Sequence, residues 1–220
     1  MGVIEKKHAH EPIISLAENY IIILMSFILF INASLTIVLW TSLSFFLTVP
    51  NIVYGADQYR VEINKTRRIL TVSNNTNRIV KQFDVALGRG GSGHKKSQGD
   101  GVTPIGSYTV VGFNKESDFH YFIRLNYPNN DDALAAYRQQ SITFNQFQEI
   151  LNANTSQEVP PQNTYLGGAI GLHGIGNETE EKLLMHSKLD WTQGCIALKN
   201  SEIEQLKPFL TLGVHVVIKE

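Results

Sequence analysis

Cysteine is nearly absent from this sequence, because the 220 residues include only Cys195. A structural zinc site needs about four ligands at recognisable spacing, and one cysteine with scattered histidines does not offer them. Exported proteins tend to pair their cysteines or to avoid them. A lone thiol therefore has either a packing role in the core, where free cysteines are common, or a chemical role. The neighbours of Cys195 decide between the two.

Excess charge of either sign is also absent. Lysine and arginine number 19 against 20 aspartate and glutamate residues, and the chain after residue 56 holds 17 of each sign. Nucleic-acid binding requires a clustered positive field, so this balance argues against it. The charge count indicates nothing further about the partner.

No charged residue occurs between Asn19 and Ala56, and the stretch from Ile21 to Val49 is almost entirely apolar. A bilayer core of about 30 Å needs roughly 20 helical residues, whereas a cleaved signal peptide has an apolar region of about 7–15 residues. The length predicts a transmembrane helix retained as a signal anchor. The alternative is a cleaved signal peptide, with Val53 and Gly55 as the small residues before the cut at Ala56.

The predicted organisation is a stub and anchor over residues 1–56, followed by one folded domain over residues 57–220. More basic residues follow the anchor than precede it: Lys6 and Lys7 come before it, and Arg60, Lys65, Arg67 and Arg68 come after it. Counted alone, this distribution would keep the folded domain in the cytoplasm. Large domains can be exported regardless of local charge, so the chemistry of the domain takes precedence.

After Ala56 the sequence changes to short alternating runs separated by turn residues, a pattern typical of strands and hairpins. Three such runs within about 30 residues predict an antiparallel meander. Further strands are expected near residues 107–111, 119–125, 169–173 and 214–218.

Helical segments are fewer. Residues 131–139 and 143–152 predict two short helices within an insertion between about residues 128 and 165. Ser201-x-x-Glu204 predicts a capping box that opens one C-terminal helix ending near Leu210. The predicted fold class is therefore mainly β, with a short helical insertion and one C-terminal helix.

A glycine-rich stretch, GRGGSGHKKSQGDGVTPIG, occupies residues 88–106. It contains no GxxxxGK[ST], and no GxGxxG placed between a strand and a helix, so it matches neither phosphate-binding pattern. A structural loop on a β scaffold is the favoured interpretation.

Two segments carry potential chemistry. IGLHG (170–174) ends a strand on His173 followed by a chain-turning glycine, and DWTQGCIA (190–197) places Cys195 directly after Gly194. A thiol needs a lowered pKa or an adjacent base to attack a carbonyl, and histidine is suited to be that base. A preceding glycine lets backbone amides turn toward an oxyanion. The alternative for His173 is a hydrogen-bonded histidine at a strand end, without a role in chemistry.

These segments make the chain similar to the L,D-transpeptidase catalytic domain family, the YkuD-type domain. In that family an HG segment is followed by a [Ser/Thr]-His-Gly-Cys signature, and here His173-Gly174 is followed by TQGC (192–195). The upstream GDGVTPIG resembles the family's GDxxTPxG segment through Gly99, Asp100, Thr103, Pro104 and Gly106. The loop at Gly88 and Asn126-Tyr127-Pro128 agree as well. The resemblance covers about residues 58–220.

Two positions depart from the family pattern. Gln193 stands where many members have histidine, and Ala197 stands where many carry arginine. Members that read WT-x-GCIA resemble this chain, which places it in a subgroup. The two positions bear on the choice of acceptor and on how the stem peptide is held.

The resemblance implies a β-sandwich-like fold and acyl transfer on peptidoglycan stem peptides, without a metal or organic cofactor. His173 would act as general base and acid toward Cys195, whose thiolate attacks the carbonyl at the L-centre of diaminopimelate. D-Ala leaves and an amine resolves the thioester. Gly194 and Thr192 are the expected oxyanion or orienting residues, and Gly174 and Gln193 are expected to contact substrate. Carbapenem-type β-lactams are the expected inhibitors.

Two alternatives remain. The same Cys-His site could serve an L,D-carboxypeptidase or amidase-type wall hydrolase with water as acceptor, or the domain could be a non-catalytic wall-binding module that does not need Cys195. Peptidoglycan lies outside the cytoplasmic membrane. The implied function therefore predicts a single-pass protein of that membrane, with the catalytic domain on its periplasmic or extracytoplasmic side.

Overall fold

The computed structural model describes residues 24–26, 28 and 59–220. The chain divides into two units, Met1–Val53 and Tyr54–Glu220. The four described residues of the first unit are helical and exposed. The predicted anchor lies almost wholly outside the described residues, and so do the cleavage site and the boundary at residue 56. Among the residues that are described, no helix has the length and apolar character needed to cross a membrane.

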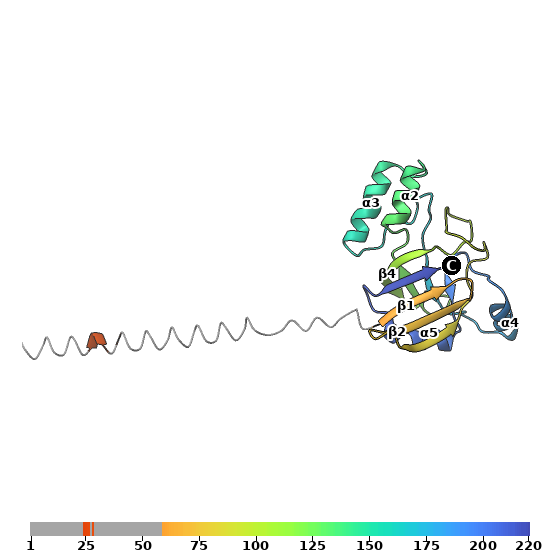
Figure 1. Ribbon diagram of the computed structural model, residues 1–220, viewed down its shortest axis with the longest axis horizontal. Helices are drawn as coiled ribbons and strands as arrows, with labels where there is room; N and C mark the ends of the chain where they lie inside the picture. Colours follow the sequence, from red (N-terminus) through yellow and green to blue (C-terminus); the bar gives the residue numbers. More distant parts are fainter. Residues whose placement is uncertain (1–23, 27, 29–58) are drawn as a thin grey trace, which may run out of the picture. The chain divides into compact units, whose positions relative to one another are not determined.

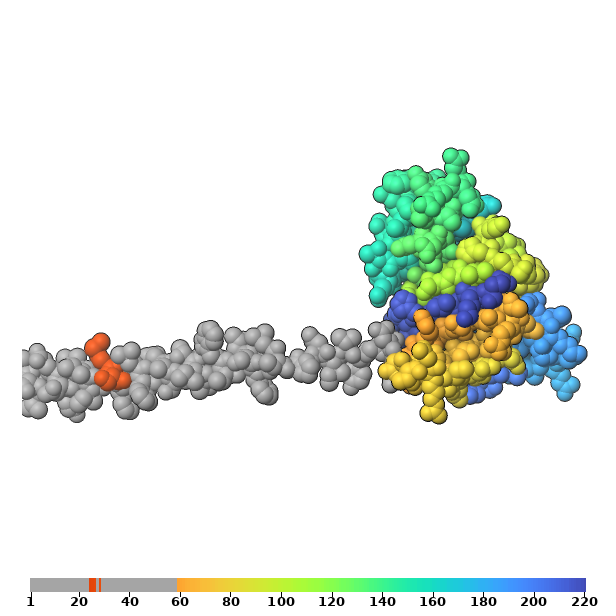
Figure 2. Space-filling view, viewed as in Figure 1, coloured from red at the N-terminus to blue at the C-terminus, as the bar shows by residue number. Residues whose placement is uncertain are grey.

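The second unit is built on one eight-stranded sheet with the order β3-β2-β1-β8-β4-β5-β6-β7. Its strands are β1 Tyr59–Asn64, β2 Ile69–Asn74, β3 Ile79–Asp84, β4 Gly106–Asn114, β5 Phe122–Leu125, β6 Gly171–His173, β7 Ile196–Ala197 and β8 His215–Lys219. The predicted meander is confirmed, since β1, β2 and β3 pair antiparallel in succession. Strand β8 lies between β1 and β4 (Figure 2). It is parallel to β1 and antiparallel to β4.

The core explains why the strands take this register. Val61 and Ile63 of β1 pair with Val216 and Ile218 of β8, and all four side chains are buried. Their chain neighbours point to the other face because successive side chains of a strand alternate. A slip of one residue would turn each of these apolar side chains away from the core, so burial fixes the pairing.

The sheet curves strongly enough to bring its two ends together. Ala86, just beyond β3, forms an antiparallel bridge with Ala197 of β7, and Gly88 forms a parallel bridge with Thr192. The predicted mainly β fold class is confirmed. The core is enclosed by one bent sheet, whereas the expected sandwich-like fold implied two stacked sheets. This closure brings the glycine-rich stretch against the segment that carries Cys195.

The helical insertion is confirmed as α2, Asn130–Arg138, and α3, Phe144–Thr155. Both begin with a capping box, formed by Asn129 with Asp132 and by Thr143 with Gln146. Figure 1 shows the two helices side by side at one end of the domain, with α4 at the opposite end.

The predicted C-terminal helix is confirmed as α5, Asn200–Leu206, which is followed by the 3₁₀ turn η2, Lys207–Phe209. A further helix, α4, Glu180–Lys188, precedes β7 and was not predicted. The expected capping pair was wrong, because the Lys199 N–H donates to Glu202 instead. Asn200 accepts hydrogen bonds from two amides between β6 and α4 and so fixes the first turn of α5 earlier than predicted. Glu204 pairs with His120 and Lys207 instead.

Candidate active site

The pairing of three short strands brings the two predicted segments together. Strand β6 pairs antiparallel with β5, which places His173 opposite Phe122 and Gly171 opposite Arg124. Strand β6 also pairs in parallel with β7, which places Leu172 opposite Ile196 and His173 opposite Ala197. Extending this register by one residue toward the N-terminus of both strands places Gly171 opposite Cys195. Paired residues project from the same face of a sheet, and residues two apart share that face. Cys195 and His173 therefore face the same side from neighbouring strands.

A pocket of about 480 Å³ lies over this face. Its lining is part aromatic and part polar: Asn114, Ser117, Phe119, Phe122, Arg124, Ala169, His173, Trp191, Thr192, Gln193 and Cys195. The predicted residues Cys195, His173, Thr192 and Gln193 thus share one pocket. Gly174 and Gly194 are not part of the lining and act on the pocket through their backbones.

His173 is buried, with 3% of its surface exposed, and its ring is fixed on one side. Nδ1 lies 2.6 Å from the Gly174 carbonyl oxygen. A carbonyl only accepts, so Nδ1 carries the proton and Nε2 keeps a free lone pair. Burial lowers the pKa of His173, although the Gly174 contact opposes this. The ring is therefore neutral near pH 7 and able to accept a proton.

Aromatic rings hold His173 from two further directions. The ring of Phe119 lies 4.5 Å from that of His173, and the ring of Trp191 lies 5.9 Å from it at an angle of 72°. Trp191 in turn donates from Nε1 to Nδ1 of His186 at 3.4 Å. This apolar surrounding excludes water from the imidazole and is the physical cause of its lowered pKa.

Cys195 is half-buried, and its thiol donates to the Ala169 carbonyl oxygen at 3.2 Å rather than to His173. Burial raises the pKa of Cys195 to about 11, while a hydrogen bond from the Gly171 amide and the charges of Lys95 and Arg124 act in the opposite direction. The pair at rest is thus a neutral thiol and a neutral imidazole. For Cys195 to act as a nucleophile, its thiol would have to leave Ala169 and pass its proton to Nε2 of His173, and such contacts commonly tighten only when substrate binds.

Thr192 holds the turn that carries Cys195. Its hydroxyl donates to the Cys195 carbonyl oxygen at 2.7 Å and accepts from the Gly194 N–H at 3.1 Å. The orienting contacts of Thr192 are therefore made to the cysteine turn. Because the Gly194 N–H is already engaged, the Cys195 N–H is a better candidate than Gly194 to face an oxyanion.

Gly194 has a backbone conformation and surroundings that require glycine. Its φ is +125°, and a Cβ there would lie 2.8 Å from the Val102 carbonyl oxygen. The glycine-rich stretch also approaches from Gly88, where a Cβ would lie 2.9 Å from the Gly194 Cα. The two segments are therefore packed backbone against backbone.

Asp100 organises the glycine-rich stretch, in agreement with a structural loop. Its carboxylate accepts from Lys95 Nζ at 2.7 Å and from the amides of Lys96, Ser97 and Val102. Burial alone would raise the pKa of Asp100, but these donors outweigh it and lower the pKa to about 2.

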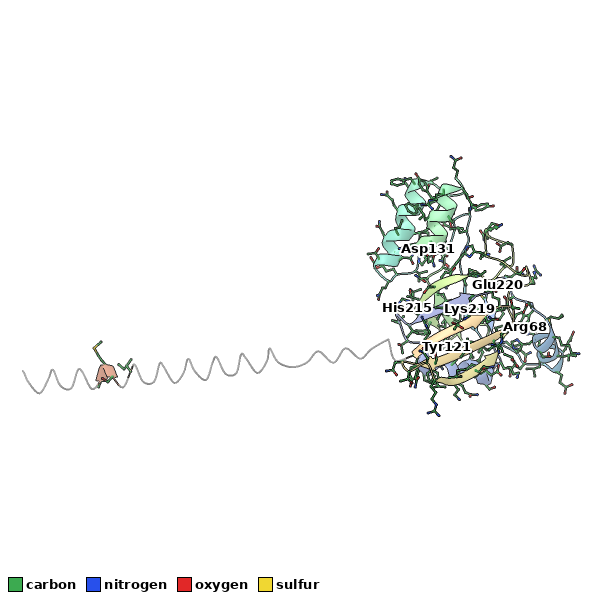
Figure 3. The ribbon with its side chains drawn as sticks, viewed as in Figure 1. Arg68, Tyr121, Asp131, His215, Lys219 and Glu220 are labelled. Atoms are coloured by element: carbon green, nitrogen blue, oxygen red, sulfur yellow. The ribbon has the colours of Figure 1, made fainter. Side chains whose placement is uncertain are left out.

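The C-terminal residue holds the same stretch from the other side. Glu220 accepts from the Gly93 N–H at 3.1 Å and forms an ion pair of 3.4 Å with the buried Lys65. Figure 3 shows Lys219 and Glu220 at the end of β8 that faces this stretch. The contacts of Asp100 thus brace the loop internally, and Glu220 ties its Gly93 part to the end of β8.

Metal ligands are not gathered at this pocket. Over the part of the chain that the structure describes, no three His, Cys, Asp or Glu side chains lie close enough together to hold a metal ion. The arrangement offers instead a thiol, an imidazole with a free nitrogen, and backbone amides, which is what acyl transfer through a thioester requires.

Some pocket residues had no assigned role in the sequence. Arg124 belongs to β5, and Phe119 lies in the turn before β5; both are far in sequence from the His173 and Cys195 segments. The alternation of side chains along a strand indicates only which face of the sheet a residue occupies. Trp191 is part of the cysteine segment DWTQGCIA (190–197), but its contact with His173 depends on tertiary packing. Arg124 and Phe119 have no local sequence signal.

Comparison with known proteins identifies the family. The family model for the YkuD L,D-transpeptidase catalytic domain matches residues 58–218. No curated protein matches the chain. Similar solved structures include the helical cell shape determining protein Pgp2 from Campylobacter jejuni, in its K307A mutant form, with 23% identity and a TM-score of 0.48, covering 74% of this chain and 47% of that one. Bd1075 from Bdellovibrio bacteriovorus has 19% identity and a TM-score of 0.46, covering 74% of this chain and 48% of that one.

A third similar structure is L,D-transpeptidase 1 from Mycobacterium tuberculosis, with 13% identity and a TM-score of 0.39, covering 74% of this chain and 62% of that one. This chain thus spans about half the length of the first two. At these identities and scores the solved structures carry no argument about activity, and the assignment rests on the match to the family model. On that match, which covers nearly the whole described domain, the chain belongs to the L,D-transpeptidase catalytic domain family.

Proposed function

We propose that the protein is an L,D-transpeptidase that acts on peptidoglycan stem peptides. The observation that carries the proposal is one pocket that holds both the only thiol of the chain and a buried imidazole with a free Nε2. Family membership supplies the reaction type, because the matched family is that of the L,D-transpeptidase catalytic domain.

The reaction has two halves that share one thioester. As the sulfur of Cys195 attacks the carbonyl at the L-centre of diaminopimelate, His173 Nε2 takes the thiol proton. Collapse of the tetrahedral intermediate breaks the bond to D-Ala, whose nitrogen receives that proton from His173. An acceptor amine then attacks the thioester, and His173 takes the amine proton and returns it to the departing sulfur. The lowered pKa of His173 supports this cycle, since the ring must be neutral at the start of each half.

The acceptor distinguishes this proposal from the hydrolase alternative. Water in place of the amine would give an L,D-carboxypeptidase with the same first half. The half-exposed Cys195 and the exposed Gln193 at the pocket leave room for an acceptor beside the thioester. We therefore propose an amine as the acceptor, with water as the outcome to be tested. Because the substrate lies outside the cytoplasmic membrane, we also propose that the domain works on the periplasmic or extracytoplasmic side, held by its N-terminal segment.

The test uses purified disaccharide-tetrapeptides and the full-length protein. We expect release of D-Ala and formation of crosslinked dimers, and both should be lost in Cys195→Ala. Tripeptide monomers without dimers would assign the hydrolase instead. Release of D-Ala that persists in Cys195→Ala would refute the nucleophile. Exposure to a carbapenem should add one mass equivalent to the wild-type chain and none to the variant, because a strained lactam acylates the same thiol.

A further inference from the structure

We infer that Arg124 is the carboxylate-binding residue of this pocket and that it holds a carboxylate of the donor stem peptide beside Cys195. The inference rests on the proposed function for the identity of the donor. It adds a residue that determines which donors are accepted, and it assigns the pocket a preference for anionic substrates.

The sheet register places Arg124 in line with the nucleophile. Arg124 on β5 lies opposite Gly171 on β6. Cys195, directly before β7, lies opposite Gly171 on the other edge of β6. Three residues thus form one row across the sheet, and the middle one has no side chain. Two inter-strand spacings of about 4.8 Å put the outer Cα atoms about 10 Å apart. The arginine side chain has the length to reach over the gap left by Gly171.

Gly171 is required for this gap. A Cβ at Gly171 would lie 2.2 Å from the Ile123 carbonyl oxygen and 2.7 Å from the ring of Phe122. The pocket floor is therefore backbone at this point. A substrate lying over it would meet the guanidinium of Arg124 on one side and the sulfur of Cys195 on the other.

Arg124 is held by neutral partners only. One of its nitrogens donates to Oε1 of Gln162 at 3.3 Å, and the guanidinium lies 5.3 Å from the centre of the Phe122 ring. Gln162 is itself fixed, because it also donates to the carbonyl oxygens of Tyr127 and Pro160. The same Oε1 accepts from the amide of Ala169, whose carbonyl oxygen receives the thiol of Cys195. One amide side chain thus positions both the cation and the residue that holds the nucleophile.

The charge of Arg124 is not compensated within the described chain. No carboxylate of residues 59–220 lies within 4.0 Å of it, and it is the one lining residue with a formal charge when His173 is neutral. Lys95 makes the contrast, because Asp100 pairs with it at 2.7 Å. A half-buried guanidinium without an anion presents donors that suit a carboxylate in both charge and geometry.

The charge also reaches the thiol, since Arg124 acts to lower the pKa of Cys195. A bound carboxylate would cancel part of that effect while it orients the donor. The inference therefore predicts a split in the kinetics. Loss of Arg124 should raise KM for anionic donors and should slow alkylation of the free thiol only modestly.

A tetrapeptide stem offers two carboxylates near the scissile bond, that of the terminal D-Ala and that of the D-centre of diaminopimelate. The first experiment therefore compares three donors: the free tetrapeptide, the tetrapeptide with an amidated terminus, and the tetrapeptide with amidated diaminopimelate. Amidation of the recognised carboxylate should lower kcat/KM of the wild type roughly 10- to 100-fold, as expected for a lost charge-assisted hydrogen bond. Arg124→Gln should show the same loss on the free donor and no further loss on the amidated one. If amidation lowered kcat/KM of Arg124→Gln by the same factor as it lowers that of the wild type, the inference would be overturned.

A second experiment needs no stem peptide, because the chain has one thiol. The thiolate of Cys195 displaces iodide from iodoacetate, which carries a carboxylate, or from iodoacetamide, which does not. Dividing the rate with iodoacetate by the rate with iodoacetamide cancels any change in the pKa of the thiol. We expect this iodoacetate-to-iodoacetamide ratio to fall about 10-fold in Arg124→Gln and less in Arg124→Lys, which keeps the charge.

The two experiments separate the two proposals. If no donor is turned over but the alkylation ratio depends on Arg124, the proposed function fails and Arg124 remains the carboxylate-binding residue. If donors are turned over while both the ratio and the donor preference are unchanged in Arg124→Gln, the inference about Arg124 is overturned and the proposed function stands.

Discussion

Thr192→Val removes the hydroxyl that holds the turn of Cys195 and keeps almost the same shape. The side chain is 4% exposed, and its two hydrogen bonds, to the Cys195 carbonyl oxygen and from the Gly194 N–H, measure 2.7 and 3.1 Å. A polar group that stays buried after losing its partner costs about 1–3 kcal/mol. With one donor and one acceptor affected, we expect the free energy of unfolding to fall by about 2–4 kcal/mol.

The same change should slow acylation of Cys195. The turn sets the position of the sulfur relative to His173, and a displacement of about 1 Å can cost about 100-fold in rate. We therefore expect the folded fraction of Thr192→Val to react with a carbapenem about 10- to 100-fold more slowly than the wild type.

The matched control is Thr192→Ser, which keeps the hydroxyl and loses one methyl group. It should cost about 1 kcal/mol and leave the acylation rate nearly intact. Urea unfolding followed by near-UV circular dichroism gives the stability, and intact mass over time gives the rate. Equal stability and equal rates for the valine and serine variants would refute the role assigned to the Thr192 hydroxyl.

Four further predictions concern His173, the loop behind the pocket and the turn that carries Cys195. Because burial lowers the pKa of His173, the acidic limb of acylation should have its midpoint below 6.5; activity is present above that limb and lost as pH falls through it. His173→Gln should slow acylation about 10²–10⁴-fold, and an unchanged rate in the folded fraction would remove His173 from the mechanism. Asp100 has its pKa lowered from 3.8 to about 2, so its stabilising effect is present above pH 4 and is lost as pH falls toward 2. Asp100→Asn should therefore cost about 1–2 kcal/mol at pH 7, allowing for solvent screening, and the difference from wild type in urea unfolding should shrink at pH 3; a gap independent of pH would contradict this. Gly194→Ala should cost about 1–3 kcal/mol because of its positive φ, and a melting temperature equal to that of the wild type would contradict the tight packing against Val102.

The sequence predicted those strands and helices that depend on contacts between near neighbours in the chain. Alternation in the first three strands and the turns between them were sufficient for the meander, and the polar-apolar pattern after residue 128 gave α2 and α3. Helix α4 was missed although Thr179 caps it, because its short sequence resembles a polar loop. The start of α5 was misplaced because Asn200 binds amides that lie 24 and 25 residues earlier in the chain.

The sequence by itself determined the chemistry available to this protein. A single thiol beside a glycine, and a histidine at a strand end, restrict the candidates for nucleophile and base, and the order of the motifs indicates the family. Residue identity suffices here because reactivity belongs to the side chain.

Only the tertiary structure decided which groups meet. Alternation states which face of a strand a residue occupies, but it does not state which strand lies beside it. The insertion of β8 between β1 and β4, the row formed by Arg124, Gly171 and Cys195, and the contact of Thr192 with the cysteine turn all depend on pairing between segments distant in sequence. Burial and hydrogen bonding across the whole sheet determine this pairing. The residues of one strand therefore do not specify which strand lies beside it.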